Sequence, residues 1–223
     1  MTQNSVFIWI PKNAGTSFSI AIGAEKFKTL DDVKSGFQNQ GRVTFVHMDY
    51  ARLVKEGYVT SAFDQTAFKY CFVRNPYDRA VSLYKYLMKV NRLKYLSWSL
   101  RIKEKFFSRG NIEISFLEFC RLLSEYEVEP VGLYSSKRVN HCNPQVRWIE
   151  NLDMDFIGRF ENLDNDTNRV FEELGLQGVE MIHENRSNDH GYEGFYCQES
   201  KEIIEHLYHE DFSQFGYERQ VKL

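Results

Sequence analysis

The segment that most constrains the fold of this chain spans residues 6–22. An apolar run, Val6–Ile10, is followed at once by Pro-Lys-Asn-Ala-Gly-Thr-Ser over residues 11–17, and then by apolar residues at helical spacing. This order predicts a strand, a tight loop and a helix that begins near Thr16. Backbone N–H groups at the start of a helix bind anions, and Lys12 adds a positive charge to the loop. The segment therefore predicts a site for a phosphate or sulfate ester.

The loop differs from the standard P-loop of nucleotide-binding proteins. In the pattern Gly-x4-Gly-Lys-Ser/Thr the lysine follows the second glycine, and the adjacent hydroxyl binds Mg²⁺. Here Lys12 precedes Gly15 and the loop is shorter, so that lysine–hydroxyl pair is missing. Taken alone, the segment leaves open an ordinary strand–loop–helix connection with a solvated lysine.

A second strand–helix junction carries further candidate anion-binding residues. The run Phe68–Val73 is apolar and rich in β-forming residues, and Arg74-Asn75-Pro76 follows it. Asn75 suits the N-cap position and Pro76 suits the first helical turn, so a helix should begin here. Arg74 is then expected at the carboxyl end of a parallel strand, where open α/β sheets bind ligands. Ser82 would lie about two turns along the helix, and a guanidinium and a hydroxyl on separate elements can bind one phosphate.

Together the two junctions resemble the sulfotransferases that use 3′-phosphoadenosine 5′-phosphosulfate (PAPS). Residues 11–17 are similar to that family's 5′-phosphosulfate loop, and Arg74 with Ser82 is similar to its 3′-phosphate motif. The carbohydrate sulfotransferase branch is the most similar, with a loop that commonly reads Pro-Lys-Thr-Ala-Gly-Thr-Ser. Asn13 replaces the common threonine, a mild change because much of that loop binds through its backbone. The resemblance implies the following donor-binding residues: Lys12, Asn13, Ala14, Gly15, Thr16, Ser17, Arg74 and Ser82.

Later parts of the chain extend the resemblance. Residues 154–163 and 208–217 are similar to segments of the same family. Arg186 and Ser187 lie where the family has a late loop that closes over the nucleotide, so the resemblance implies that they contact the adenosine. A polar surface loop is the alternative for these two residues.

One basic stretch stands out in a chain whose net charge is −3. Residues 85–109 contain eight lysines and arginines and one acidic residue, with interleaved leucine and aromatic side chains. A solvated helix face is one interpretation. The other is that residues 85–112 form a basic insertion that binds an anionic acceptor or steers the donor itself.

Histidines are the natural candidates for a general base. His47 directly follows the expected strand 42–46, at the same sheet edge as Lys12 and Arg74. Several carbohydrate sulfotransferases place a catalytic histidine between the two phosphate motifs, so the resemblance implies that His47 is the base; a histidine that caps a strand end is the alternative. His141 is the second candidate. The other histidines are expected at the surface: His183, His190, His206 and His209.

The implied reaction is in-line transfer of a sulfuryl group from PAPS to an acceptor hydroxyl, with the 3′,5′-bisphosphate PAP as product. Lys12 would stabilise charge on the bridging oxygen and His47 would take the acceptor proton. The expected acceptor is a glycan or a small molecule, and no metal is expected because lysine, arginine and backbone amides balance the donor's charge. A P-loop-type nucleotide kinase and a non-catalytic binder of sulfated or phosphorylated ligands are the alternatives.

Alternating strand and helix patterns predict an α/β, three-layer, P-loop-like fold with a central parallel sheet flanked by helices. With 223 residues and 43% hydrophobic content, the chain is expected to form one domain over residues 1–223. The expected strands are 6–10, 42–46, 67–73 and 154–158. The expected helices are 16–25, 50–56, 77–90, 113–126, 165–174 and 199–208, with residues 31–41 as a loop.

Composition limits the partners and the location. The net charge of −3 gives no electrostatic reason to expect nucleic acid. No apolar run approaches the ~20 residues of a membrane span, and residues 1–5 are polar, so neither a span nor a signal peptide is expected. Reduced thiols rather than a zinc site are expected from four scattered cysteines, Cys71, Cys120, Cys142 and Cys197. These features predict a soluble, cytoplasmic protein; removal of an N-terminal membrane anchor, which Golgi members of the resembled family carry, is the alternative.

Overall fold

The structure is a computed structural model that describes residues 3–90, 113–125, 131–132, 140–181 and 191–221. The chain divides into two compact units. The first contains the described residues up to Arg74 together with residues 131–132 and 145–181, and the second contains residues 75–90, 113–125, 140–144 and 191–221. The expectation of one domain over residues 1–223 stays a prediction.

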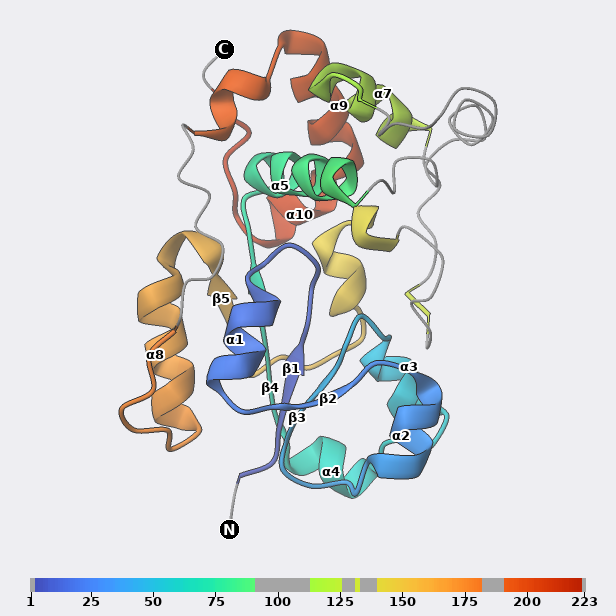
Figure 1. The fold of residues 1–223 in the computed structure, drawn as a ribbon, viewed down its shortest axis with the longest axis vertical. Helices are drawn as coiled ribbons and strands as arrows, with labels where there is room; N and C mark the ends of the chain where they lie inside the picture. Colours follow the sequence, from blue (N-terminus) through green and yellow to red (C-terminus); the bar gives the residue numbers. More distant parts are fainter. Residues whose placement is uncertain (1–2, 91–112, 126–130, 133–139, 182–190, 222–223) are drawn as a thin grey trace. The chain divides into compact units, whose positions relative to one another are not determined.

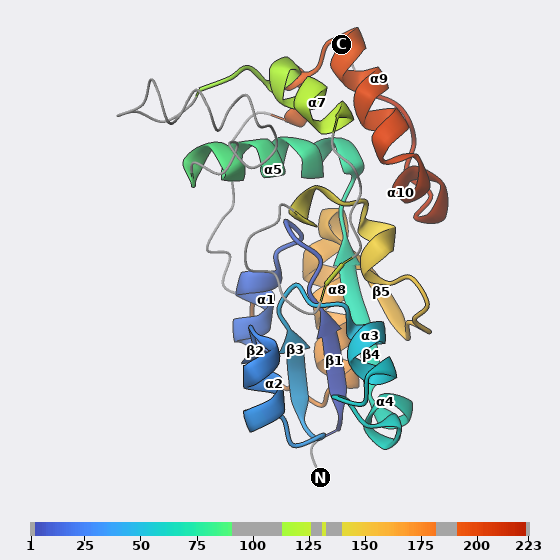
Figure 2. The same cartoon turned by 90° about the vertical axis from the view of Figure 1, so that its right-hand side faces the viewer.

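The first unit is built on a parallel sheet of five strands in the order β2-β3-β1-β4-β5. The strands are β1 (Ser5–Ile8), β2 (Glu25–Phe27), β3 (Arg42–Phe45), β4 (Phe68–Val73) and β5 (Phe156–Arg159). Figure 2 shows β3, β1 and β4 side by side. Ile8 pairs with Cys71, so the carboxyl ends of the central strands β1 and β4 lie together. This sheet confirms the predicted α/β fold class.

Helices cover both faces of this sheet, as Figure 1 shows. On one face lie α1 (Gly15–Ala21) and α8 (Leu163–Glu173), and the parallel rings of Phe18 and Phe171 are 5.9 Å apart between them. On the other face lie α2 (Leu30–Gly36), α3 (Tyr50–Lys55) and α4 (Ser61–Thr66). There Phe37 packs edge-on against Phe45 and Phe63, with ring centroids 5.2 and 5.1 Å away.

The prediction of a loop over residues 31–41 was wrong, because most of helix α2 lies in this range. Thr29 caps this helix: its side chain accepts from the Asp32 N–H, and the Asp32 carboxylate accepts from the Thr29 N–H. This capping box stabilises a helix of seven residues that is too short to show apolar periodicity. The helix predicted over residues 16–25 also ends early, because Gly23 has a φ of 61° and residues 25–27 form β2.

The second unit is helical. Its helices are α5 (Pro76–Lys89), α7 (Phe116–Ser124), α9 (Gln198–Leu207) and α10 (His209–Gln214). The start of α5 confirms the prediction: Asn75 caps it by accepting from the Tyr77 N–H at 3.0 Å, and Pro76 is in its first turn. The apolar faces of the four helices share one core that includes Leu83, Phe119 and Ile204. Within the described residues, no helix is both long enough and apolar enough to cross a membrane.

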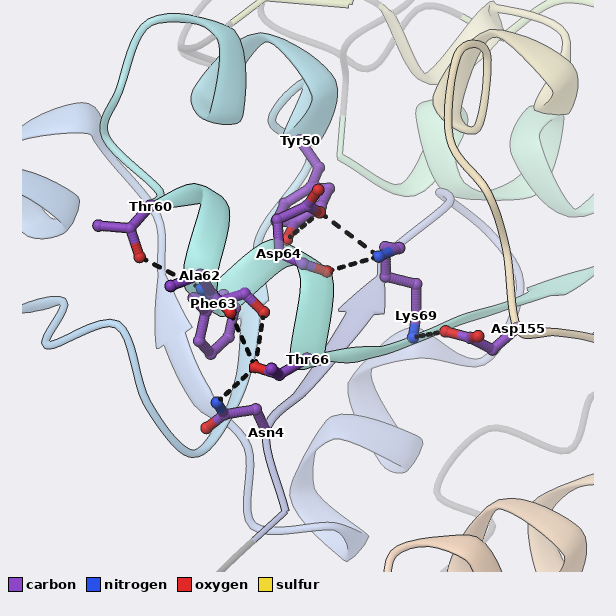
Figure 3. A network of polar contacts seen from close by, with 9 residues as sticks. All are labelled: Asn4, Tyr50, Thr60, Ala62, Phe63, Asp64, Thr66, Lys69 and Asp155. Carbon is purple, nitrogen blue, oxygen red and sulfur yellow. Dashed lines mark hydrogen bonds and ion pairs between the residues drawn. The ribbon is translucent and has the colours of Figure 1, made fainter.

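A polar network, drawn in Figure 3, fixes α3 and α4 against the amino end of β4. Tyr50 donates to the Asp64 carboxylate at 2.9 Å, and the Lys69 ammonium lies 3.5 Å from that carboxylate and donates to the Asp64 carbonyl at 2.7 Å. The Lys69 backbone N–H in turn donates to Asp155 at 2.7 Å. These contacts lie towards the amino end of β4, away from the predicted phosphate-binding residues at the carboxyl ends of the strands, and their role is structural.

Candidate functional site

The predicted phosphate loop lies at the carboxyl end of β1, between that strand and α1. Lys12 and Ala14 have positive φ angles of 74° and 59°, whereas the φ angle of Asn13 between them is not positive. A backbone that alternates in this way forms a concave nest whose N–H groups bind anions. Helix α1 has only seven residues, so the nest and the Lys12 ammonium are the main attraction for an anion here.

Gly15 is required by a close contact rather than by its backbone angle. A Cβ atom at this position would lie 2.0 Å from Nε1 and 2.3 Å from Cδ1 of Trp9. The indole therefore covers the first residue of α1, and any side chain at Gly15 would displace it.

Asn13 is buried, and its side chain is held by the sheet. Its Nδ2 donates to the Phe72 carbonyl at 2.7 Å and to Oε1 of Gln145 at 2.8 Å. The amide therefore anchors the loop to the end of β4, and the predicted contribution of Asn13 to donor binding would come from its backbone.

Arg74 directly follows β4 and lies against the phosphate loop. Its Nη1 donates to the Lys12 carbonyl at 3.2 Å, and its guanidinium carbon is 3.9 Å from the centre of the Phe160 ring. The residue is 9% exposed, so stacking and hydrogen bonding hold the planar group in a defined place. The structure thus brings Lys12 and Arg74 together, as expected from two adjacent parallel strands.

His47 lies two residues beyond β3 and is held by Trp9. Its Nδ1 is 3.1 Å from the Trp9 carbonyl oxygen, and the rings of Trp9 and Trp148 pack edge-on against the imidazole at 5.4 and 5.9 Å. Burial, assisted by the positive charge of Lys12, lowers the pKa of His47 to about 4, although the hydrogen bond to Trp9 acts in the opposite direction. The imidazole is therefore neutral near pH 7, as a general base must be.

The other predicted donor-binding residues are placed as follows. Thr16 is exposed and Ser17 is half-buried, both in the first turn of α1. Ser82 is half-buried on α5, in the second unit. Arg186 and Ser187 lie outside the described residues, as does most of the basic stretch 85–109.

The remaining histidines differ in environment. His141 belongs to the second unit, where its carbonyl accepts from Nη2 of Arg79 at 2.9 Å and its ring is 5.8 Å from that of Tyr86. His206 and His209 are exposed, which confirms their prediction as surface residues. His183 and His190 lie outside the described residues.

Sequence reasoning missed Gln145, Trp148 and Phe160, and it overlooked Trp9. Gln145 and Trp148 belong to a 3-10 helix, η3 (Gln145–Trp148), and Phe160 begins another, η4 (Phe160–Asn162). Helices this short carry no periodic pattern, and these residues reach the site from distant parts of the sequence. A single glutamine or aromatic residue in such a segment gives no signal of its own.

In the part of the chain that the structure describes, no group of three or more His, Cys, Asp and Glu side chains could hold a metal ion. Cys71, Cys120, Cys142 and Cys197 are free thiols, and the first three are buried.

Comparison with known proteins assigns the family. Residues 2–218 match the model of the sulfotransferase family, so the chain belongs to that family. It is also similar to carbohydrate sulfotransferase 14 of Danio rerio, with 26% identity over 166 residues that cover 67% of this chain and 44% of that protein. The chain thus spans less than half the length of this relative. The family match confirms the resemblance to sulfotransferases, and this relative is itself named a carbohydrate sulfotransferase.

Proposed function

We propose that this chain transfers the sulfuryl group of PAPS to a hydroxyl group of a carbohydrate. The observation that carries the proposal is the arrangement of Lys12, Arg74 and His47 at one edge of the sheet of a sulfotransferase-family chain. Arg74 donates to the Lys12 carbonyl, and the charge of Lys12 acts on the imidazole of His47. A cation for each end of the donor and a neutral base therefore occur in one neighbourhood.

Donor binding would use the two predicted motifs. The nest formed by Lys12, Asn13 and Ala14 suits the 5′-phosphosulfate, because three successive backbone N–H groups and an ammonium all attract a dianionic group. Arg74 and Ser82 would bind the 3′-phosphate, for which a planar guanidinium is well shaped. Arg186 and Ser187 are proposed to contact the adenosine.

The chemistry would be an in-line displacement at sulfur. The acceptor oxygen forms a bond to sulfur while the bond from sulfur to the 5′-phosphate oxygen breaks, and the electron pair of that bond stays on the phosphate. Lys12 stabilises the charge that develops on this oxygen, and His47 accepts the proton of the acceptor hydroxyl. The negative charges of bound PAPS would raise the pKa of His47 above its value in the donor-free protein, which makes the imidazole a better base.

The acceptor class follows from the relative. That protein is named a carbohydrate sulfotransferase, and a carbohydrate hydroxyl is therefore the acceptor proposed for this chain.

Ligand-dependent stability followed by a turnover assay tests the proposal. PAP at ~100 times its dissociation constant should add about 2.7 kcal/mol to the free energy of unfolding, whereas ATP with Mg²⁺ should add little. PAPS should then be consumed in the presence of one member of a glycan panel, with PAP and a sulfated glycan formed in equal amounts. Stabilisation by ATP with Mg²⁺ alone would indicate a kinase. Stabilisation by PAP without consumption of PAPS on any glycan would indicate a non-catalytic binder.

A further inference from the structure

We propose that Gln145 is a positioning residue that couples the phosphate loop to Arg74 and so sets the preference for nucleotides with a 3′-phosphate. The inference rests on the proposed function. Gln145 begins η3 and is fully buried at 0% exposure. It contacts both predicted anion-binding elements through hydrogen bonds of 2.8 to 2.9 Å.

The first contact is with the main chain of Arg74. Oε1 of Gln145 accepts from the Arg74 N–H at 2.9 Å, and Nε2 donates to the Arg74 carbonyl at 2.8 Å. The side-chain amide thus pairs with Arg74 as a neighbouring strand would, one residue beyond the end of β4. This pairing fixes the backbone of Arg74 where the chain leaves the sheet, and hence the direction from which its side chain starts.

The second contact is with the phosphate loop. Oε1 of Gln145 also accepts from Nδ2 of Asn13 at 2.8 Å, and the same Nδ2 donates to the Phe72 carbonyl. Because both partners of Nδ2 are oxygens, the orientation of the Asn13 amide is determined. One buried carbonyl oxygen therefore uses its two acceptor sites to join the loop to the end of β4.

These contacts close a ring of interactions. Gln145 holds Asn13 and the backbone of Arg74, and the Arg74 side chain returns to the carbonyl of Lys12, which is adjacent to Asn13. A shift of the loop would then shift Arg74 as well. Because the three hydrogen bonds of Gln145 are buried, where such bonds are stronger than in water, the ring keeps the sites for the two ends of the donor at a fixed separation.

The test compares PAP with adenosine 5′-monophosphate, which lacks the 3′-phosphate. Gln145→Met has a side chain of similar length but makes none of the three hydrogen bonds. We expect the dissociation constant of PAP, measured by calorimetry, to rise 10- to 100-fold and that of the monophosphate to rise less than threefold. The ratio of the monophosphate constant to the PAP constant, which measures the preference for PAP, should therefore fall at least threefold. Gln38→Met makes the same change at an exposed glutamine of the first unit and should leave the ratio unchanged.

A double-mutant cycle separates positioning from a general structural role. In the Arg74→Ala background, Gln145→Met should not reduce the PAP preference any further, because Gln145 acts through Arg74. If Gln145→Met fails to fold, Gln145→Asn, whose amide is one methylene shorter, provides the same comparison with a smaller change. A preference for PAP that persists in the folded Gln145 variants would overturn the inference. Failure of the wild-type protein to bind PAP would instead overturn the proposed function.

Discussion

The Nδ1 atom of His47 lies 3.1 Å from the carbonyl oxygen of Trp9, the residue that follows β1. A carbonyl oxygen can only accept, so the neutral imidazole carries its proton on Nδ1 and presents a lone pair on Nε2. His47 also has a φ of 55°, a left-handed conformation that this hydrogen bond helps to hold. The strand that leads into the phosphate loop therefore also sets the tautomer of the proposed base.

His47→Asn tests the base without removing this support. The asparagine amide nitrogen can occupy the place of Nδ1 and donate to Trp9, and asparagine tolerates the left-handed conformation, but it has no counterpart of Nε2. We expect the fold and PAP affinity to remain and turnover to fall by about 10²–10⁴. His209→Asn is the control, because the Nδ1 of this exposed histidine likewise contacts a backbone carbonyl, that of His206, at 3.1 Å. Wild-type turnover in His47→Asn would remove His47 from the mechanism.

The depressed pKa of His47 predicts how stability depends on pH. The pKa is about 4 in the folded chain and 6.5 in the unfolded chain, so between these values the unfolded state binds more protons. The stabilising effect of the neutral imidazole is therefore complete above pH 6.5 and is lost as the pH falls towards 4, a change of about 3 kcal/mol. Urea unfolding of the wild type and of His47→Asn at pH 7.5, 6.0 and 4.5 measures this contribution as a difference. Equal losses of stability in the two proteins would contradict it.

Gly15→Ala should damage the site through Trp9. Since the new Cβ would lie 2.0 Å from the indole, the ring must move away from its contacts with His47. We expect a loss of about 1–3 kcal/mol in the free energy of unfolding, together with a changed tryptophan fluorescence. Gly36→Ala is the matched control in α2: its Cβ meets the ring of Phe27 at 3.5 Å, an ordinary contact, so it should be neutral or slightly stabilising. Equal stability of the two variants would contradict this, because it would show that the Trp9 ring can move without a loss of stability.

The sequence predicted well those features that depend on local pattern. The apolar runs marked four of the five strands, and Asn75 with Pro76 marked the start of α5. The shared edge of a parallel sheet then placed Lys12 near Arg74, although 62 residues separate them. Local pattern and sheet topology were sufficient for this result.

The contacts between distant short segments could not be predicted. β2 has only three residues, and the helix after it depends on the capping box of Thr29 rather than on an apolar stripe. Gln145 is 132 residues from Asn13, and nothing in its surroundings in the sequence indicates which backbone groups it binds. The side chain of Asn13 was likewise expected to matter little, yet it anchors the loop to the end of β4.

Lys12→Met should separate catalysis from binding. The variant keeps a side chain of similar length but has no charge to stabilise the leaving oxygen. Turnover should fall by about 10²–10³, whereas the dissociation constant of PAP should change much less, because the nest still supplies backbone N–H groups. Calorimetry with PAP and initial rates with PAPS measure the two quantities. A variant that loses affinity and turnover by the same factor would show that Lys12 serves binding alone.

Arg74→Met should give the opposite result. The side chain of Arg74 is the candidate for the 3′-phosphate, so its loss should weaken PAPS and PAP to the same extent and leave adenosine 5′-monophosphate largely unaffected. Arg74→Lys retains the charge but cannot reproduce the planar contact with Phe160 or the fork of N–H groups, so it should recover only part of the affinity. Competition between PAP and the monophosphate, measured for the wild type and both variants, gives the preference for a 3′-phosphate directly. If Arg74→Met binds PAP as tightly as the wild type does, the guanidinium serves only to support the loop through the Lys12 carbonyl, and another residue must recognise the 3′-phosphate.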